Sequence, residues 1–110
     1  MAFSEELAAR VREQLVDVKK LEEKQMFRGM CFMVDDKMCI CINQDEIMCR
    51  IGPDHYEAAL GRPGCRAMLR NGKPIEGFVY VNERFLENKK DLSYWVTLSL
   101  AYNKRAKSSK

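Results

Sequence analysis

The segment from Met26 to Ile51 limits the possible folds of this chain more than any other part of the sequence. Three short, largely apolar runs, Met30–Val34, Met38–Ile42 and Glu46–Ile51, alternate with polar clusters of three residues. This pattern is typical of an antiparallel meander, in which short strands are joined by tight turns. Four of the five cysteines lie inside this segment, so their facing follows from the strand register.

The polar break between the first two runs is short enough for a tight hairpin. With a two-residue loop, either Asp35-Asp36 or Asp36-Lys37, the numbers of opposed residues add up to an odd value. Cys31 then faces away from the two cysteines of the second run. Those two are predicted to share a face with alternate residues of the first run: Cys39 and Cys41 with Met30, Phe32 and Val34.

The second polar break, Asn43-Gln44-Asp45, decides where Cys49 lies. A three-residue loop places Cys49 directly opposite Cys39, whereas a four-residue loop reverses this facing. The middle run, Met-Cys-Ile-Cys-Ile, is apolar on both faces, which is not expected of a sheet with one wet side. We therefore expect helices on one face, and either the last helix or a second subunit on the other.

The first part of the chain is predicted to form an amphipathic helix from about Glu5 to Glu22. Ser4 is a suitable N-cap, and the acids after it complement the positive end of the helix dipole. Apolar side chains then recur at helical spacing and form one stripe: Leu7, Val11, Leu15 and Val18. Such a stripe is expected to pack on the sheet.

Further strands and helices are predicted after the meander. They are a short helix from Asp54 to Leu60, strands at Cys65–Leu69 and Gly77–Val81, and a last helix from Leu92 to about Lys104. Asn71-Gly72 is a strong hairpin signal, and Pro74 places this strand pair at an edge or gives it an irregular start. Asp91 is the expected cap of the last helix. The predicted class is α+β, with an N-terminal helix, an antiparallel meander sheet of about five strands, a short middle helix and a C-terminal helix.

The composition is that of one globular domain. The 110 residues are 46% hydrophobic and 32% charged, without a Pro-rich, Gly-rich or Ser-rich linker, which predicts a single domain over residues 1–110. The start is acidic where a signal peptide would be basic, and no apolar run approaches the roughly 20 residues of a membrane helix. We therefore expect a cytoplasmic protein without membrane contact, whose five cysteines are reduced and unpaired.

Positive charge is concentrated in a C-terminal tail, residues 104–110. The tail holds four cations and no acid: Lys104, Arg105, Lys107 and Lys110. Without them the net charge of +3 becomes −1, so the body is nearly neutral and is not expected to present a basic face. A few lysines can neutralise a few phosphates, which makes weak, salt-sensitive binding to nucleic acid one alternative function.

A thiol or metal site built on Cys39, Cys41 and Cys49 is a second alternative. The spacing is unfavourable, because zinc ligands usually lie about two to four residues apart on a loop, and here the close pair lies inside a strand. The single histidine, His55, is remote in sequence and has no neighbouring nucleophile. We predict buried structural thiols, with no metal, cofactor or catalytic residue.

Five residues are candidates for contact with a ligand or partner: Arg28, Arg50, Trp95, Lys104 and Arg105. Arg50 lies within an apolar strand and needs a partner if it is buried. Arg28, beside Gly29, could meet an anion through exposed backbone amides, although neither a P-loop nor a GxGxxG pattern follows. Trp95 belongs to the apolar stripe of the last helix, and the other two cations open the tail.

Five segments of the chain form a recognisable series. They are Met26–Val34, Asp36-Lys37-Met38, Arg50-Ile51-Gly52, Gly77–Val81 and Leu92-x-x-Trp95-Val96. Their order and spacing resemble the N-terminal domain of the TfoX/Sxy family, from the first helix to the last. The resemblance implies an α+β domain with a curved antiparallel sheet, similar to the secretion-chaperone-like fold. Arg28 departs from the family pattern, since a second glycine is common there.

The resemblance also implies a function. Full-length members are regulators of natural competence, thought to act with the catabolite-activator protein at promoters of DNA-uptake genes, and they look non-enzymatic. This sequence stops where their second, helical domain would begin, and no catalytic or ligand-binding residue can be carried over. The leading interpretation is a stand-alone regulatory or protein-interaction module, a homodimer with a protein partner such as the transcription machinery.

Overall fold

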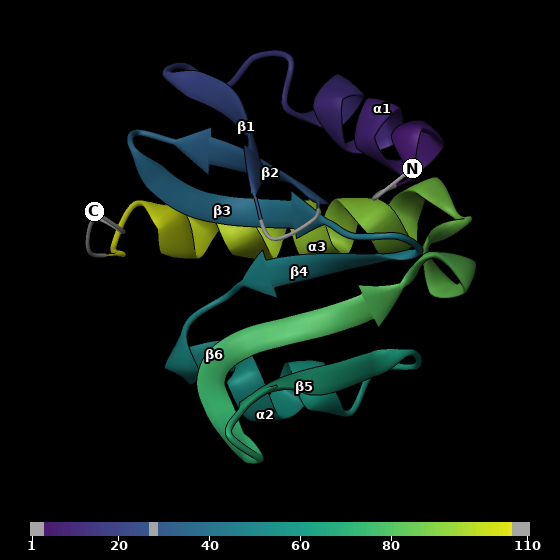
Figure 1. The fold of residues 1–110 in the computed structure, drawn as a ribbon, viewed down its shortest axis with the longest axis vertical. Coiled ribbons are helices and arrows are strands. Elements are labelled where there is room, and N and C mark those ends of the chain that lie inside the picture. Colours follow the sequence, from purple (N-terminus) through teal and green to yellow (C-terminus); the bar gives the residue numbers. More distant parts are fainter. Residues whose placement is uncertain (1–3, 27–28, 107–110) are drawn as a thin grey trace.

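The computed structural model describes residues 4–26 and 29–106. Six antiparallel strands form one sheet in the order β1-β2-β3-β4-β6-β5 (Figure 1). The strands are β1 (Leu21–Met26), β2 (Gly29–Val34), β3 (Lys37–Ile42), β4 (Glu46–Arg50), β5 (Cys65–Arg70) and β6 (Lys73–Asn82). The helices are α1 (Glu5–Gln14), α2 (Tyr56–Leu60) and α3 (Lys89–Asn103), with 3-10 turns η1 (Pro53–His55) and η2 (Glu83–Leu86). The predicted α+β class is confirmed.

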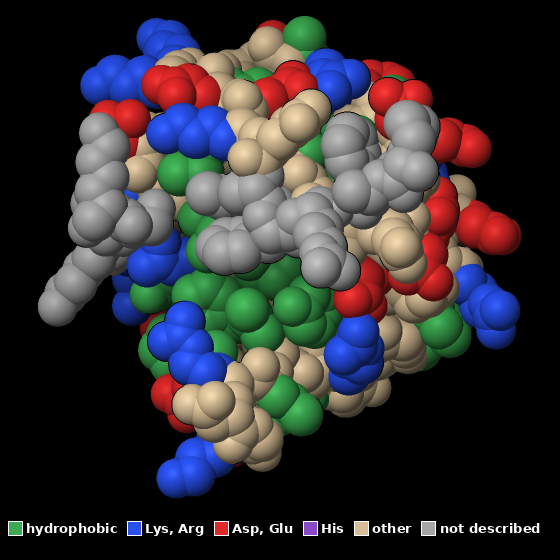
Figure 2. Space-filling view, viewed as in Figure 1, with side chains coloured by type: hydrophobic (Ala, Val, Ile, Leu, Met, Phe, Trp, Pro, Cys, Tyr) green, Lys and Arg blue, Asp and Glu red, His purple; other side chains and the backbone are tan. Residues whose placement is uncertain are grey.

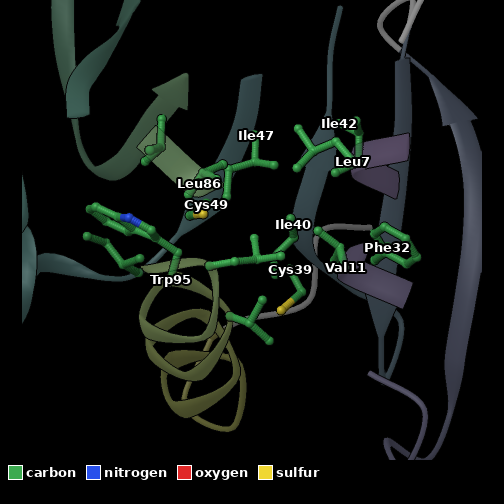
Figure 3. Close-up of a cluster of buried hydrophobic side chains, with 14 of the residues drawn as sticks. Leu7, Val11, Phe32, Cys39, Ile40, Ile42, Ile47, Cys49, Leu86 and Trp95 are labelled. Atoms are coloured by element: carbon green, nitrogen blue, oxygen red, sulfur yellow. The ribbon is translucent and has the colours of Figure 1, made fainter. Parts of the chain in front are cut away.

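The helices pack on one face of the sheet, which we call the inner face. In Figure 1, α3 runs behind β3 and α2 lies behind β5. Side chains from α1, α3 and the central strands form one buried cluster (Figure 3). Its largest fully buried members include Trp95, Phe32, Leu7, Leu15, Ile40 and Ile42. Burial of each such side chain stabilises the fold by about 1.5–3 kcal/mol, so this cluster holds the helices on the sheet.

The N-terminal helix is shorter than the sequence predicts. Ser4 does cap it, because its Oγ accepts a hydrogen bond from the Leu7 amide at 3.1 Å, but α1 ends at Gln14 rather than Glu22. Lys20 has a left-handed backbone (φ 58°), and the chain then enters β1, which pairs with β2 along its whole length. The pairing of this segment with β2 thus outweighs the helix propensity of its residues. β1 is the sixth strand, which the prediction missed.

A bulge in the first hairpin corrects the predicted facing of Cys41. The two-residue loop is Asp35-Asp36, both at positive φ, and Met33 opposes Met38 with the expected odd sum. The register then shifts between Phe32 and Met33, so that Cys31 directly opposes Cys41. A bulge opposes two residues to one and reverses the facing beyond it. Cys39 therefore lies on the inner face as predicted, whereas Cys41 lies on the opposite face, which we call the outer face.

The bulge also overturns the prediction of five unpaired thiols. Cys31 and Cys41, brought together on adjacent strands, form a disulfide. The other three cysteines, Cys39, Cys49 and Cys65, are free. The sequence indicated the strands correctly, but a bulge has no clear sequence signal, so this pairing could not be anticipated.

The second loop follows the four-residue alternative. Ile42 opposes Ile47 and Ile40 opposes Cys49, while the Asn43 amide donates to the Glu46 carbonyl at 2.8 Å. Cys39 is the extra residue of the bulge and shares the inner face with Ile40, and Cys49, which opposes Ile40, lies on that face too.

The β5–β6 hairpin lies at the sheet edge, one of the alternatives that the sequence predicts. Asn71 and Gly72, both at positive φ, form its turn. β6 is longer than expected, since it begins at Lys73 rather than Gly77. The backbone of Gly77 also has positive φ and lies against Gly52, which fixes the bend of β6 near the end of β4.

The last helix begins three residues earlier than predicted. Asn88, rather than Asp91, is its N-cap, because the Asn88 side-chain oxygen accepts from the Lys90 amide at 2.8 Å. Asp91 instead lies in the first turn, where its charge favours the helix dipole. Within the described residues, no helix combines the length and apolarity needed to cross a membrane.

Candidate interaction surface

The outer face of the sheet carries a second apolar cluster, separate from the helix-covered core. Its buried members are Cys31, Met33, Cys41 and Met48, and its partly buried members are Met38, Met68, Phe78 and Tyr80. Figure 2 shows hydrophobic side chains gathered in the middle of this face, in front of β4 and β6. Most members of the cluster are cysteines or methionines. Methionine side chains adapt readily to different partners.

A groove of about 370 Å³ opens within this cluster. Its apolar walls come from β3, β4, β5 and β6: Met38, Met48, Met68, Ile75, Phe78 and Tyr80. Cys41 also lines the groove, and Asn43 and Arg70 supply its polar part. A concave, mainly apolar surface with a few polar groups is typical of a binding site.

One cation beside the groove, Arg66, is paired with a carboxylate. The Arg66 guanidinium lies 4.7 Å from the centre of the Tyr80 ring and donates to both carboxylate oxygens of Glu46, at 2.7 and 2.8 Å. This arrangement fixes the Tyr80 ring from the solvent side. Because the cation is paired, covering this part of the face would not leave the Arg66 charge buried without a partner.

Arg50, a predicted candidate, joins the sheet to α3. Its guanidinium carbon lies 5.7 Å from the Phe78 ring centre and 5.8 Å from that of Tyr102. Its Nε is buried and has no hydrogen-bond partner among the described residues. Two aromatic faces therefore provide part of the stabilisation that a partly buried arginine in an apolar strand needs.

The other candidates lie in different parts of the molecule. Trp95 is only 2% exposed and belongs to the inner core, so it holds α3 on the sheet. Lys104 and Arg105 are exposed after the last turn of α3, and Arg105 pairs with Asp54 at 3.0 Å. Arg28 lies outside the described residues. The structure does not bring the four described candidates together into one site.

The three cysteines proposed as a thiol or metal site are separated by the sheet. Cys41 is on the outer face in the disulfide, whereas Cys39 and Cys49 lie in the inner core. Burial raises the pKa of the Cys39 thiol to about 12, against a smaller opposing effect of Arg50. Burial likewise raises the pKa of Cys49. Within the described residues, no cluster of histidine, cysteine and acidic side chains could hold a metal ion, and the three cysteines do not meet in one site.

The residues that line the groove were not singled out from the sequence. Methionines were interpreted there as core filler, which is their more common role. The available signal was that apolar side chains face alternate sides of β4 and β6. Met48 faces the outer side between inward-facing neighbours, and Phe78 and Tyr80 flank the inward-facing Val79. A strand whose side chains are apolar on both sides indicates that both faces of the sheet are covered. It does not indicate which residues form a groove.

These features define an α+β domain whose antiparallel sheet is covered by helices on one face and carries an apolar groove on the other. One family model, that of the TfoX N-terminal domain, matches residues 13–102. The chain belongs to the TfoX N-terminal domain family, as its sequence motifs suggested. A search of curated proteins found no match, and a search of solved structures found none either.

Proposed function

We propose that this chain is a non-enzymatic regulatory module that works through protein contacts, and that the outer face of its sheet is the contact between two copies. The observation that carries the proposal is the groove on this face, with Met68, Phe78 and Tyr80 in its walls. Family membership supports a regulatory role, and the resemblance implies transcription as the process that is regulated.

The apolar side chains of the central strand β3 indicate that the outer face of the sheet is covered. β3 has apolar side chains on both sides, and α3, which the sequence analysis considered as a possible cover, packs on the inner face instead. A second copy of the chain is then the remaining candidate that we expect to cover the outer face. In a two-fold dimer the same patch is used twice, so the Met-rich groove meets its own counterpart and the balanced Glu46–Arg66 pair causes little repulsion.

The size of the face places the proposed contact among the small interfaces. Six strands spaced about 4.8 Å apart and roughly 17–20 Å long give a flat footprint of about 450 Å². Side chains roughen this footprint, so each copy would bury more than the flat area, though still less than the roughly 800 Å² per partner of a standard interface. Interfaces below the standard size are typical of weak, transient association, so we expect a reversible dimer with a dissociation constant of about 10–100 µM.

Adjacent residues on β5 provide a matched test of this proposal. Met68 lines the groove, whereas its neighbour Leu69 is 59% exposed and is not among the residues that line it. Met68→Glu places a charge in the proposed contact and should make the protein monomeric. Leu69→Glu adds the same charge one residue away and should leave the dimer intact.

Sedimentation equilibrium of the wild type and both variants measures the outcome, with circular dichroism to show that each is folded. A wild-type protein that stays monomeric at high micromolar concentration would refute the dimer. Equal loss of dimer in both variants would place the contact elsewhere.

A further inference from the structure

The Cys31–Cys41 disulfide lies in the floor of the outer face. The two cysteines oppose each other on β2 and β3 and pack with Met33 and Met48. Their exposure differs: Cys41 is 5% exposed and lines the groove, whereas Cys31 is only 1% exposed. A reagent that enters the groove therefore meets the sulfur of Cys41 first.

The position of this bond suggests that the fold does not depend on it. It links two strands that are already joined by a two-residue turn and a hydrogen-bonded ladder, with a sequence separation of only 10. A cross-link stabilises mainly by restricting the unfolded chain, and it does so least when the closed loop is short. As free thiols, both side chains would remain small apolar groups in an apolar cluster.

The other cysteines are poorly placed to exchange with this disulfide. Cys39 and Cys49 lie across the sheet in the inner core, and burial raises the pKa of both thiols. Cys65 packs against the same inner core from β5, and burial raises the pKa of its thiol to about 11. Because the thiolate is the attacking form, an external thiol is the expected partner for exchange.

We propose that Cys31 and Cys41 form a reversible thiol–disulfide site, which a small peptide-like thiol opens by entering the groove and attacking Cys41. The groove volume of about 370 Å³ is in the range that holds a small ligand, and Arg70 at its edge favours a thiol that carries carboxylates. The inference does not rest on the proposed dimer.

The exchange takes place in two steps. The thiolate of the small thiol attacks Sγ of Cys41, the bond between the protein sulfurs breaks, and Cys31 leaves as a thiolate that takes up a proton. A second molecule of the same thiol attacks the external sulfur of the mixed disulfide. This releases the small-molecule disulfide and the Cys41 thiolate, which is protonated in turn. Two small thiols are oxidised and one protein disulfide is reduced.

Redox equilibration with reduced and oxidised glutathione tests the proposal. A Cys65→Ser background removes the half-buried thiol, and intact mass spectrometry after rapid alkylation counts the free thiols. We expect one transition in which two labels appear together, mapped to Cys31 and Cys41, while circular dichroism shows that the fold is retained. A disulfide that opens only in denaturant, or a protein that never reoxidises, would overturn the proposal.

Two single substitutions in the same background test the direction of attack. Cys31→Ser leaves Cys41 free and should form a mixed disulfide with oxidised glutathione. Cys41→Ser leaves only the more buried Cys31 and should react at least about tenfold more slowly, because exchange requires access to the sulfur. Equal rates would contradict entry through the groove. If a variant does not fold, the transition measured in the Cys65→Ser protein still decides whether the site exists.

Discussion

Gly52 occupies a position that only glycine can take without strain. Its backbone has φ 82° and ψ 167°, a region that residues with a side chain rarely adopt. A Cβ at this position would also collide with the Tyr102 ring, the same ring that flanks Arg50. Gly52 therefore determines how closely the end of β4 approaches the last turn of α3.

Gly52→Ala and Gly72→Ala form a matched pair of substitutions. Gly72 has a similar φ of 79°, but a Cβ there would meet open space. Gly72→Ala should lower the free energy of unfolding by about 1–2 kcal/mol through backbone strain alone. Gly52→Ala adds the steric collision and should cost about 3 kcal/mol or more. Urea denaturation at 25 °C measures both, and equal losses would show that the Tyr102 contact does not matter.

At the scale of single elements, the sequence predicted those features that depend on local patterns. The strands of the meander, the Ser4 cap and the Asn71-Gly72 turn all have signals within a few residues. The features that were missed depend on distant partners. β1 has helix-favouring residues and exists because β2 pairs with it, and the cysteine pairing depends on a bulge in the β2–β3 ladder.

The groove was missed for a related reason. Its walls come from four strands, so it exists only when β5 and β6 are placed beside β4. The sequence did predict that β3 is covered on both faces. It could not predict which helix covers which face, since an apolar helix such as α3 could have packed on either.

An ion pair ties α1 to β1. Arg12 donates two hydrogen bonds to Glu23, both at 2.7 Å, and this contact lowers the pKa of the Glu23 carboxyl. Glu23→Gln should lower the free energy of unfolding at pH 7, but only by about 0.2–1 kcal/mol because the pair is largely exposed. Glu22→Gln, at the neighbouring exposed position of β1, is the control and should have a smaller effect.

The effect of Glu23→Gln should depend on pH in a defined direction. A carboxyl whose pKa is lowered in the folded state stabilises the fold above its unfolded pKa, and this contribution disappears as pH falls through the folded value. The difference between variant and wild type should therefore shrink as the pH is lowered from about 5 to 3. A difference that stays constant over this range would show that the ion pair is not its cause.

At the scale of the whole molecule, the sheet separates two apolar clusters with different roles. The inner cluster is closed by α1, α2 and α3 and accounts for the fold. The outer cluster, with its groove, is where we place association between copies and thiol exchange. A dimer through this face would cover Cys41, so the two proposals together require that the dissociated subunit reacts faster with thiols.

Methionine-methyl NMR on dilution tests the central proposal, association through the outer face, most directly. Met38, Met48 and Met68 line the groove, whereas Met30 lies in the inner cluster and serves as an internal control. Between about 1 mM and 10 µM, a range that spans a weak dimer, we expect the three groove methyl signals to shift while that of Met30 stays in place. Unchanged groove signals over this range, or an equal shift of Met30, would contradict the account.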